Sequence, residues 1–279
     1  MQLYSIETGL FKLDGGAMFG VVPKSMWNKL NPADENNLCT WSMRCLLIVD
    51  GERKILIDCG MGNKQSVKFF SHYHPHGNHS LLSSLREKGF QPEDITDLIL
   101  THLHFDHCGG AVYNDNETYA LTFPHATIWS NENHWKWAIE PNDREKASFL
   151  KENIIPLQES GQLKFIEEEE NGRLTPFTKH IDIRFVQGHT RSMMLPQVKI
   201  NGKTIVYMAD LIPSAAHIPL PYVMAYDMFP MKTLEEKKEL LEEAVEKEFI
   251  LFFEHDPSDS CCTVEKTEKG FRKKASVPS

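Results

Sequence analysis

Three histidines and one carboxylate lie within the short segment 102–107. His102 and His104 are separated by one residue, so in an extended segment both side chains point the same way. Asp106 and His107 follow where the chain begins to turn, so they can face a second point. Ionisable groups this close together repel one another when charged, whereas metal ligands cluster in this way. The segment therefore predicts a loop that offers nitrogens to one metal, and a nitrogen with an oxygen to a neighbouring metal.

Side chains of the same kinds recur further along the chain, each where an apolar strand-like run ends. The cluster follows the run 97–100, and the later candidates follow 181–186, 204–208 and 249–253. A single histidine at such a position is more often a core or surface residue, but the recurrence at strand ends favours a shared site. The candidates at these four ends are the segment from His102 to His107, then His189, Asp210 and His255.

The elements that must position these residues repeat along the chain. Hairpin signals span 42–58 and 197–210, and helix patterns cover 81–88, 131–153 and 234–247. A hairpin in each half predicts an α+β protein of two similar halves, each a sheet covered by helices on one side. Two such sheets face to face, with the helices outside, would bring all four strand ends to one rim.

The other histidines and the cysteines are better explained by roles other than metal binding. A second histidine-rich stretch is interrupted by Pro75 and Gly77, which favours an exposed loop over a ligand site. Its histidines are His72, His74, His76 and His79. The six cysteines have no framework spacing, which indicates reduced thiols. Cys108 adjoins the cluster and could itself be a ligand, but we expect it to be a small residue behind the ligands.

Composition sets limits on the partners. The 279 residues are 41% hydrophobic and 25% charged, which is ordinary for a globular protein. A formal charge of -9 argues against non-specific nucleic-acid binding as a purpose. The first residues lack a signal-peptide pattern, and no apolar run approaches the roughly 18 residues that span a membrane. We therefore expect a cytoplasmic protein with neither nucleic acid nor membrane as a partner.

With these residues, the chain resembles the metallo-β-lactamase superfamily. The signature H-x-H-x-D-H is met in full at 102–107, and 188–190, Asp210 and 253–256 match the later ligand segments. The run 55–60 is similar to the early strand that carries a structural aspartate, here Asp58. The resemblance covers about residues 16 to 257. It implies a four-layer αββα sandwich, one domain over 1–279, and two divalent metals, usually zinc, with iron or manganese as other choices.

The resemblance also assigns roles to residues. It places His102, His104 and His189 on the first metal, Asp106, His107 and His255 on the second, and Asp210 between the two. Asp58 is expected to orient a histidine or the loop, and Asp227 is a further candidate for such a role. A pair of metals would generate hydroxide near neutral pH for attack on a carbonyl or phosphorus centre. Asp106 is counted with the catalytic residues as well as with the ligands.

Within the superfamily, three stretches are similar to acyl-homoserine lactonases and parathion hydrolases, namely 16–23, 101–110 and 209–217. This similarity implies a small ester or lactone substrate, such as an acyl-homoserine lactone, and allows a homodimer. The lactonases place a tyrosine three residues after the bridging aspartate, where this chain has Pro213. His217 is therefore the candidate catalytic residue that would donate to the substrate oxygen, with Tyr222 and Tyr226 as alternatives.

Two other functions are compatible with the same ligands. A phosphotriesterase or phosphodiesterase uses a pair of metals for displacement at phosphorus. A non-hydrolytic di-iron module is the third interpretation, but it requires an electron-carrier domain, and no such domain is visible in the sequence.

Overall fold

The structure is a computed structural model that describes residues 1–116, 118–169 and 174–277. It divides into two compact units. Unit 1 comprises the described residues of Met1–Gly9, Met43–Asn171 and Ser192–Met194. Unit 2 comprises those of Leu10–Ser42, Gly172–Arg191 and Leu195–Ser279. The segment 102–107 lies in unit 1, and the other three candidate ligands lie in unit 2.

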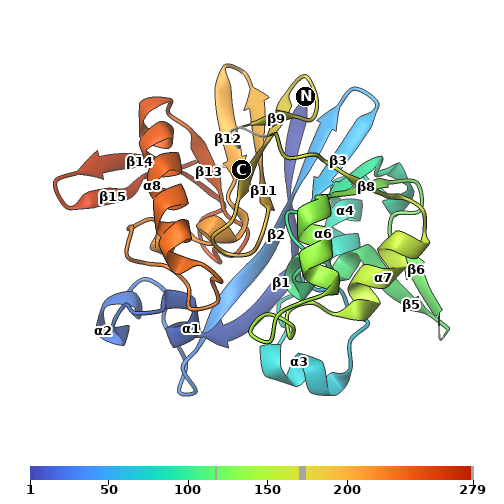
Figure 1. Ribbon diagram of the computed structural model, residues 1–279, viewed down its shortest axis with the longest axis horizontal. Coiled ribbons are helices and arrows are strands. Elements are labelled where there is room, and N and C mark those ends of the chain that lie inside the picture. The colour runs from blue at the N-terminus through green and yellow to red at the C-terminus, as the bar shows by residue number, and fades with distance from the viewer. Residues whose placement is uncertain (117, 170–173, 278–279) are drawn as a thin grey trace. The chain divides into compact units, whose positions relative to one another are not determined.

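A six-stranded sheet forms within the described residues, and most of it belongs to unit 1 (Figure 1). Its order is β1 (Gln2–Asp14), β2 (Leu38–Asp50), β3 (Arg53–Ile57), β4 (Asp97–Ile99), β7 (Thr127–Ser130) and β8 (Leu163–Phe165). β2 and β3 form the first predicted hairpin, with Leu47 opposite Leu56. β3 and β4 are parallel, so both end at the same edge of the sheet. The residues after β3 and after β4 therefore emerge side by side.

Helices complete the core of unit 1. They are α3 (Val67–Tyr73), α4 (Leu81–Glu87), η1 (Pro92–Asp94), α5 (Phe105–Cys108), η2 (Gly109–Ala111), α6 (Glu132–Ile139) and α7 (Lys151–Glu159). A two-stranded ribbon joins β5 (Val112–Asp115) to β6 (Thr118–Leu121). Apolar side chains of the sheet meet Leu85 of α4, Trp135 of α6 and Leu157 of α7 in one buried cluster. This burial supplies the main driving force for the unit.

Unit 2 carries the second sheet. Its order is β15 (Gly270–Val277), β14 (Cys261–Thr267), β13 (Ile250–Phe252), β12 (Lys203–Tyr207), β11 (Met193–Ile200), β10 (Ile181–Val186) and β9 (Thr175–Pro176). β11 and β12 form the second predicted hairpin. β12 and β13 are parallel, so the residues after each emerge at one edge. The helices are α1 (Gly15–Phe19), α2 (Lys24–Trp27), η3 (Ala209–Leu211), η4 (Ala215–His217) and α8 (Pro230–Glu246).

The prediction of an α+β protein with a sheet and helices in each half is confirmed. One predicted helix is wrong, because the stretch 131–153 is divided between α6 and α7. α6 ends before Pro141, and Glu140 adopts φ -123° and ψ 61°, outside the α region that a following proline disfavours. Among the described residues, no helix combines the length and apolarity needed to cross a membrane.

Candidate metal centre

Asp58 closes β3 and ties down the loop that follows β4. Its side chain is fully buried. Oδ1 accepts from the backbone N–H of Thr101 at 2.8 Å, and Oδ2 accepts from the Thr101 hydroxyl at 2.7 Å. Oδ2 also lies 3.1 Å from Nδ1 of His107. A carboxylate at Nδ1 keeps the proton there and leaves the lone pair of the ring on Nε2. The expectation that Asp58 orients a histidine or the loop is confirmed, since it contacts both.

The other two histidines of the loop are buried beside His107. The ring centroids of His102 and His107 are 3.9 Å apart, and those of His102 and His104 are 4.5 Å apart. Nε2 of His104 faces Oε1 of Glu145 at 3.0 Å, so Nδ1 is the nitrogen of His104 that remains to bind a metal. Glu145 also accepts from Nε1 of Trp137 at 2.6 Å, which fixes its position. Glu145 is not among the residues predicted from the sequence.

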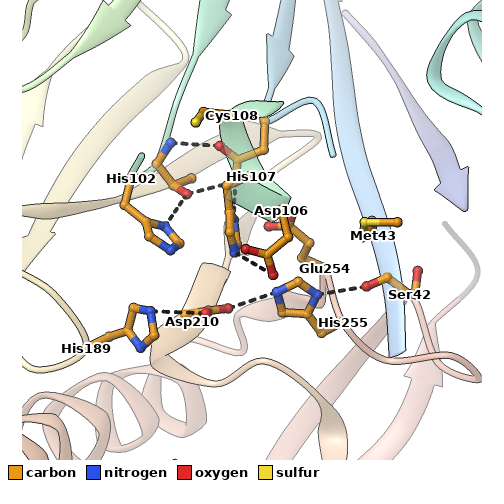
Figure 2. Close-up of polar contacts among 12 residues, drawn as sticks. Ser42, Met43, His102, Asp106, His107, Cys108, His189, Asp210, Glu254 and His255 are labelled. Atoms are coloured by element: carbon orange, nitrogen blue, oxygen red, sulfur yellow. Dashed lines mark hydrogen bonds and ion pairs between the residues drawn. The ribbon is translucent and has the colours of Figure 1, made fainter. Parts of the chain in front are cut away.

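Helix α5 carries Asp106 and His107 and starts directly after His104, whose ψ of 151° turns the chain. Oδ2 of Asp106 lies 4.0 Å from Nε2 of His107 (Figure 2). The end of α5 packs backbone to backbone against the loop after β3. A Cβ atom on Gly109 would lie 2.1 Å from the carbonyl oxygen of Met61. The glycine is therefore a steric requirement of the site.

In unit 2, one carboxylate lies between two histidines (Figure 2). Nε2 of His189 is 3.1 Å from Oδ2 of Asp210, and Nε2 of His255 is 3.1 Å from Oδ1. The far nitrogen of each ring also has a partner. Nδ1 of His189 is 2.8 Å from Oδ1 of Asp227, and Nδ1 of His255 is 2.7 Å from the carbonyl oxygen of Ser42. Asp227 therefore orients the His189 ring, and its place behind a metal ligand stays a prediction.

This arrangement suits a metal. A neutral imidazole has one N–H, and His255 must use it to donate to the Ser42 carbonyl. Its Nε2 therefore presents a lone pair to Asp210, and the same reasoning holds for His189 against Asp227. Two lone pairs that face the two oxygens of one carboxylate repel it, unless a cation or an extra proton intervenes. A divalent cation can accept electron pairs from both nitrogen and oxygen. These imidazole and carboxylate donors are the ligands found in zinc, iron and manganese sites.

Both ring nitrogens of His217 already have hydrogen-bond partners within the protein, unlike those of a histidine that donates a proton to a substrate. Its ring is buried, with Nδ1 2.7 Å from the hydroxyl of Ser214 and Nε2 2.9 Å from the carbonyl oxygen of Met18. The ring stacks on Phe19 with centroids 4.5 Å apart. Burial lowers the pKa of His217 to about 3, so the ring stays neutral. The catalytic role of His217 stays a prediction, and these contacts favour a packing role.

The remaining histidine and cysteine assignments agree with the structure. The four histidines between 72 and 79 are exposed. Cys108 is buried, donates to the carbonyl of Leu103 at 3.3 Å, and has its pKa raised by burial to about 12. It is therefore a thiol rather than a thiolate. All six cysteines are free thiols, as predicted.

The chain belongs to the metallo-β-lactamase superfamily, whose family model matches residues 44–255. Its fold is that of solved members, so the predicted family and fold class are confirmed. The structure of a probable metal-dependent hydrolase from Staphylococcus aureus is similar over 99% of this chain and 96% of that one, with a TM-score of 0.88 and 27% identity. The dizinc quorum-quenching lactonase AidC shares the fold, with a TM-score of 0.79, 22% identity, and coverage of 99% and 95%.

Curated relatives include N-acyl homoserine lactonases of Bacillus. The enzyme of Bacillus cereus is 29% identical over 166 residues, which are 56% of this chain and 62% of that enzyme. The enzyme of Bacillus thuringiensis is 26% identical over 191 residues, or 61% and 72% of the two chains. The chain thus spans less than two thirds of the length of the Bacillus cereus enzyme. The prediction of a metallohydrolase of this superfamily is confirmed at the level of the class.

Proposed function

We propose that the protein is a dinuclear metallohydrolase that opens a lactone, such as an acyl-homoserine lactone. The metal site is supported above all by the surroundings of Asp210. Nε2 of a histidine lies 3.1 Å from each of its carboxylate oxygens. Nδ1 of each of these rings already faces another hydrogen-bond partner. The names of the Bacillus relatives support the substrate. We propose zinc as the metal, because the dizinc lactonase AidC has the same fold.

We assign seven residues to two ions, on the strength of the complete family motif and of the buried donors in each unit. The first ion takes His102, His104 and His189, the second takes Asp106, His107 and His255, and Asp210 serves both. Bound there, two divalent ions would polarise a carbonyl oxygen and acidify water near neutral pH.

The chain's own residues prepare these ligands. Asp58, Glu145 and Asp227 each face the far nitrogen of one proposed ligand histidine, which fixes the orientation and the tautomer of that ring. Pro213 stands where the lactonases carry a tyrosine, so that phenol is missing as a donor to the leaving oxygen. We assign the proton transfer to Asp106: its carboxylate would accept a proton from the attacking water and pass it to the leaving oxygen of the opened ester. Its side chain is 11% exposed, so it can be reached by water.

The test combines metal content with activity. Protein purified without chelator is expected to hold about two metal ions per chain, fewer in Asp210→Asn and in His255→Ala, and an unchanged number in the exposed control His79→Ala. N-hexanoyl homoserine lactone is expected to be hydrolysed by the wild type only when metal is bound.

Other outcomes separate the alternatives. Faster turnover of a phosphotriester than of any lactone would replace the lactonase proposal by the phosphotriesterase one. A protein that binds no metal, or whose metal content is the same in both ligand variants, would refute the dinuclear site. Bound iron without hydrolysis of either substrate would favour the redox module. Cytoplasmic location, a homodimer and a single domain over 1–279 stay predictions.

A further inference from the structure

Helix α8 has charged residues on the face that it buries. The buried residues Thr233, Lys237, Leu240 and Leu241 recur at helical spacing, and the half-buried Glu236 lies on the same face. An inward helix face is ordinarily apolar, and the second half of α8 follows this rule. Its first half instead meets two loops of unit 2 through a carboxylate and an ammonium that are adjacent in sequence.

Glu236 holds the loop that ends in His189. Its Oε1 accepts from the backbone N–H of Gln187 at 2.8 Å, and its Oε2 accepts from that of Gly188 at 3.0 Å. The hydrogen bonds therefore use both carboxylate oxygens and fix two consecutive peptide units. Burial raises the pKa of Glu236 to about 7, and the bonds from Gln187 and Gly188 oppose that rise.

The same loop lies against the backbone at the start of α8. A Cβ atom on Gly188 would be 2.4 Å from the backbone nitrogen of Thr233, so only glycine fits there. The carbonyls of Gly188 and His189 accept from the backbone N–H groups of Phe229 and Met228, at 2.8 and 3.0 Å. The backbone around the proposed ligand His189 is thus held by α8 and by the two residues that precede it.

Lys237 holds the loop that follows η4. It is fully buried, and its Nζ donates to the carbonyls of Pro219 at 2.8 Å and of Tyr222 at 2.8 Å, with Leu220 at 3.4 Å. An ammonium with three N–H donors is matched to three carbonyls. The loop in turn places the Tyr222 ring edge-on against Phe19, with centroids 6.1 Å apart.

We infer that Glu236 is a positioning residue for the proposed ligand His189, and that Lys237 separately positions the loop Pro219–Tyr222. This inference rests on the proposed metal role of His189. Neither residue is a catalytic group in this scheme. Glu236 acts on metal binding through the backbone of the ligand loop, whereas Lys237 acts on a different loop. The two adjacent side chains should therefore have separable effects.

The experiment uses the full chain loaded with Co²⁺, and it compares Glu236→Gln with Lys237→Met. The exposed neighbours supply matched controls, Glu239→Gln and Lys238→Met. Chelator competition measures metal retention, the visible spectrum of Co²⁺ reports ligand geometry, and amide hydrogen exchange follows the two loops. All three measurements are independent of turnover.

Glu236→Gln is expected to release one metal about tenfold faster than the wild type. This is the lower end of the roughly 10- to 100-fold loss that follows removal of a residue that orients a metal ligand. It should also change the Co²⁺ spectrum and raise exchange at Gln187 and Gly188. Lys237→Met is expected to raise exchange at Leu220 and Tyr222, with metal release within about twofold of the wild type. Both controls should match the wild type.

Equal effects of the two substitutions on metal release would overturn the inference, because a general loss of α8 packing would then account for both. Unchanged metal release and spectrum in Glu236→Gln would overturn it as well. A thermal melt of each variant identifies unfolding. If Lys237→Met does not fold, Lys237→Arg takes its place, since it keeps the charge but alters the geometry of donation. A wild type that binds no Co²⁺ would instead refute the proposed function itself.

Discussion

Replacement of Asp58 by asparagine tests how the ligand loop selects its tautomer. The backbone of Asp58 has φ 56°, a conformation that asparagine tolerates better than most residues, so the fold is expected to survive. The amide oxygen can still accept from the N–H of Thr101. The amide nitrogen then replaces the oxygen that faces Nδ1 of His107 at 3.1 Å. His107 must therefore carry its proton on Nε2, the nitrogen proposed to bind metal.

The size of the effect follows from that one lost interaction. A hydrogen bond to a charged group contributes about 1.5–3 kcal/mol. At about 1.4 kcal/mol per factor of ten, the metal bound by His107 should be held roughly 10- to 100-fold more weakly. Chelator competition measures this affinity, and ¹⁵N NMR of the metal-free protein should show the proton of His107 moved from Nδ1 to Nε2.

Asp97→Asn is the matched control. Asp97 is also a buried carboxylate of unit 1, and it accepts from Arg53 at 2.6 Å and from Nε1 of Trp129 at 2.9 Å. It should lose stability without weakening metal binding. The reasoning is refuted if Asp58→Asn binds metal as tightly as the wild type, or if Asp97→Asn weakens metal binding to the same extent.

Three further predictions concern other parts of the chain. Glu145→Gln should weaken metal binding roughly tenfold through His104, as chelator competition measures; an unchanged affinity would contradict the contact at 3.0 Å. His72→Ala, at an exposed position, should change the free energy of unfolding by less than about 0.5 kcal/mol in urea titration. Burial lowers the pKa of Lys237 from 10.5 to about 7. Between these values the unfolded chain binds more protons than the folded protein, so stability should rise with pH, and urea unfolding at stepped pH should show a flatter slope in Lys237→Met.

The residues that lie at strand ends could be predicted because polar residues there interrupt an apolar run. The segment 102–107 and the pair Asp210 and His255 follow strands whose parallel pairing brings their ends to one edge of a sheet. Asp58 follows such a strand as well. In each case, periodicity in the sequence already indicates where the side chain emerges.

The partners behind the ligands could not be predicted in the same way. Glu145 lies in the irregular stretch between α6 and α7, where no period indicates the direction of a side chain. Glu236 and Lys237 belong to a highly charged helix, and charges on a helix ordinarily face solvent. The spacing from Thr233 to Leu241 does contain a signal, because it places both residues on the face that carries the buried leucines. His217 shows the converse limit, since a sequence does not reveal that both ring nitrogens are already bonded.

The division of the chain between the units has a consequence for synthesis on the ribosome. Unit 2 uses Leu10–Ser42 from near the start of the chain, yet most of its sheet comes from residues after 195. Phe11 packs against His255 and Phe19 stacks on His217. At about 5–20 residues per second, these partners emerge on the order of ten seconds or more after the aromatic residues. During that interval Phe11 and Phe19 lack the histidine partners that pack against them in the folded protein.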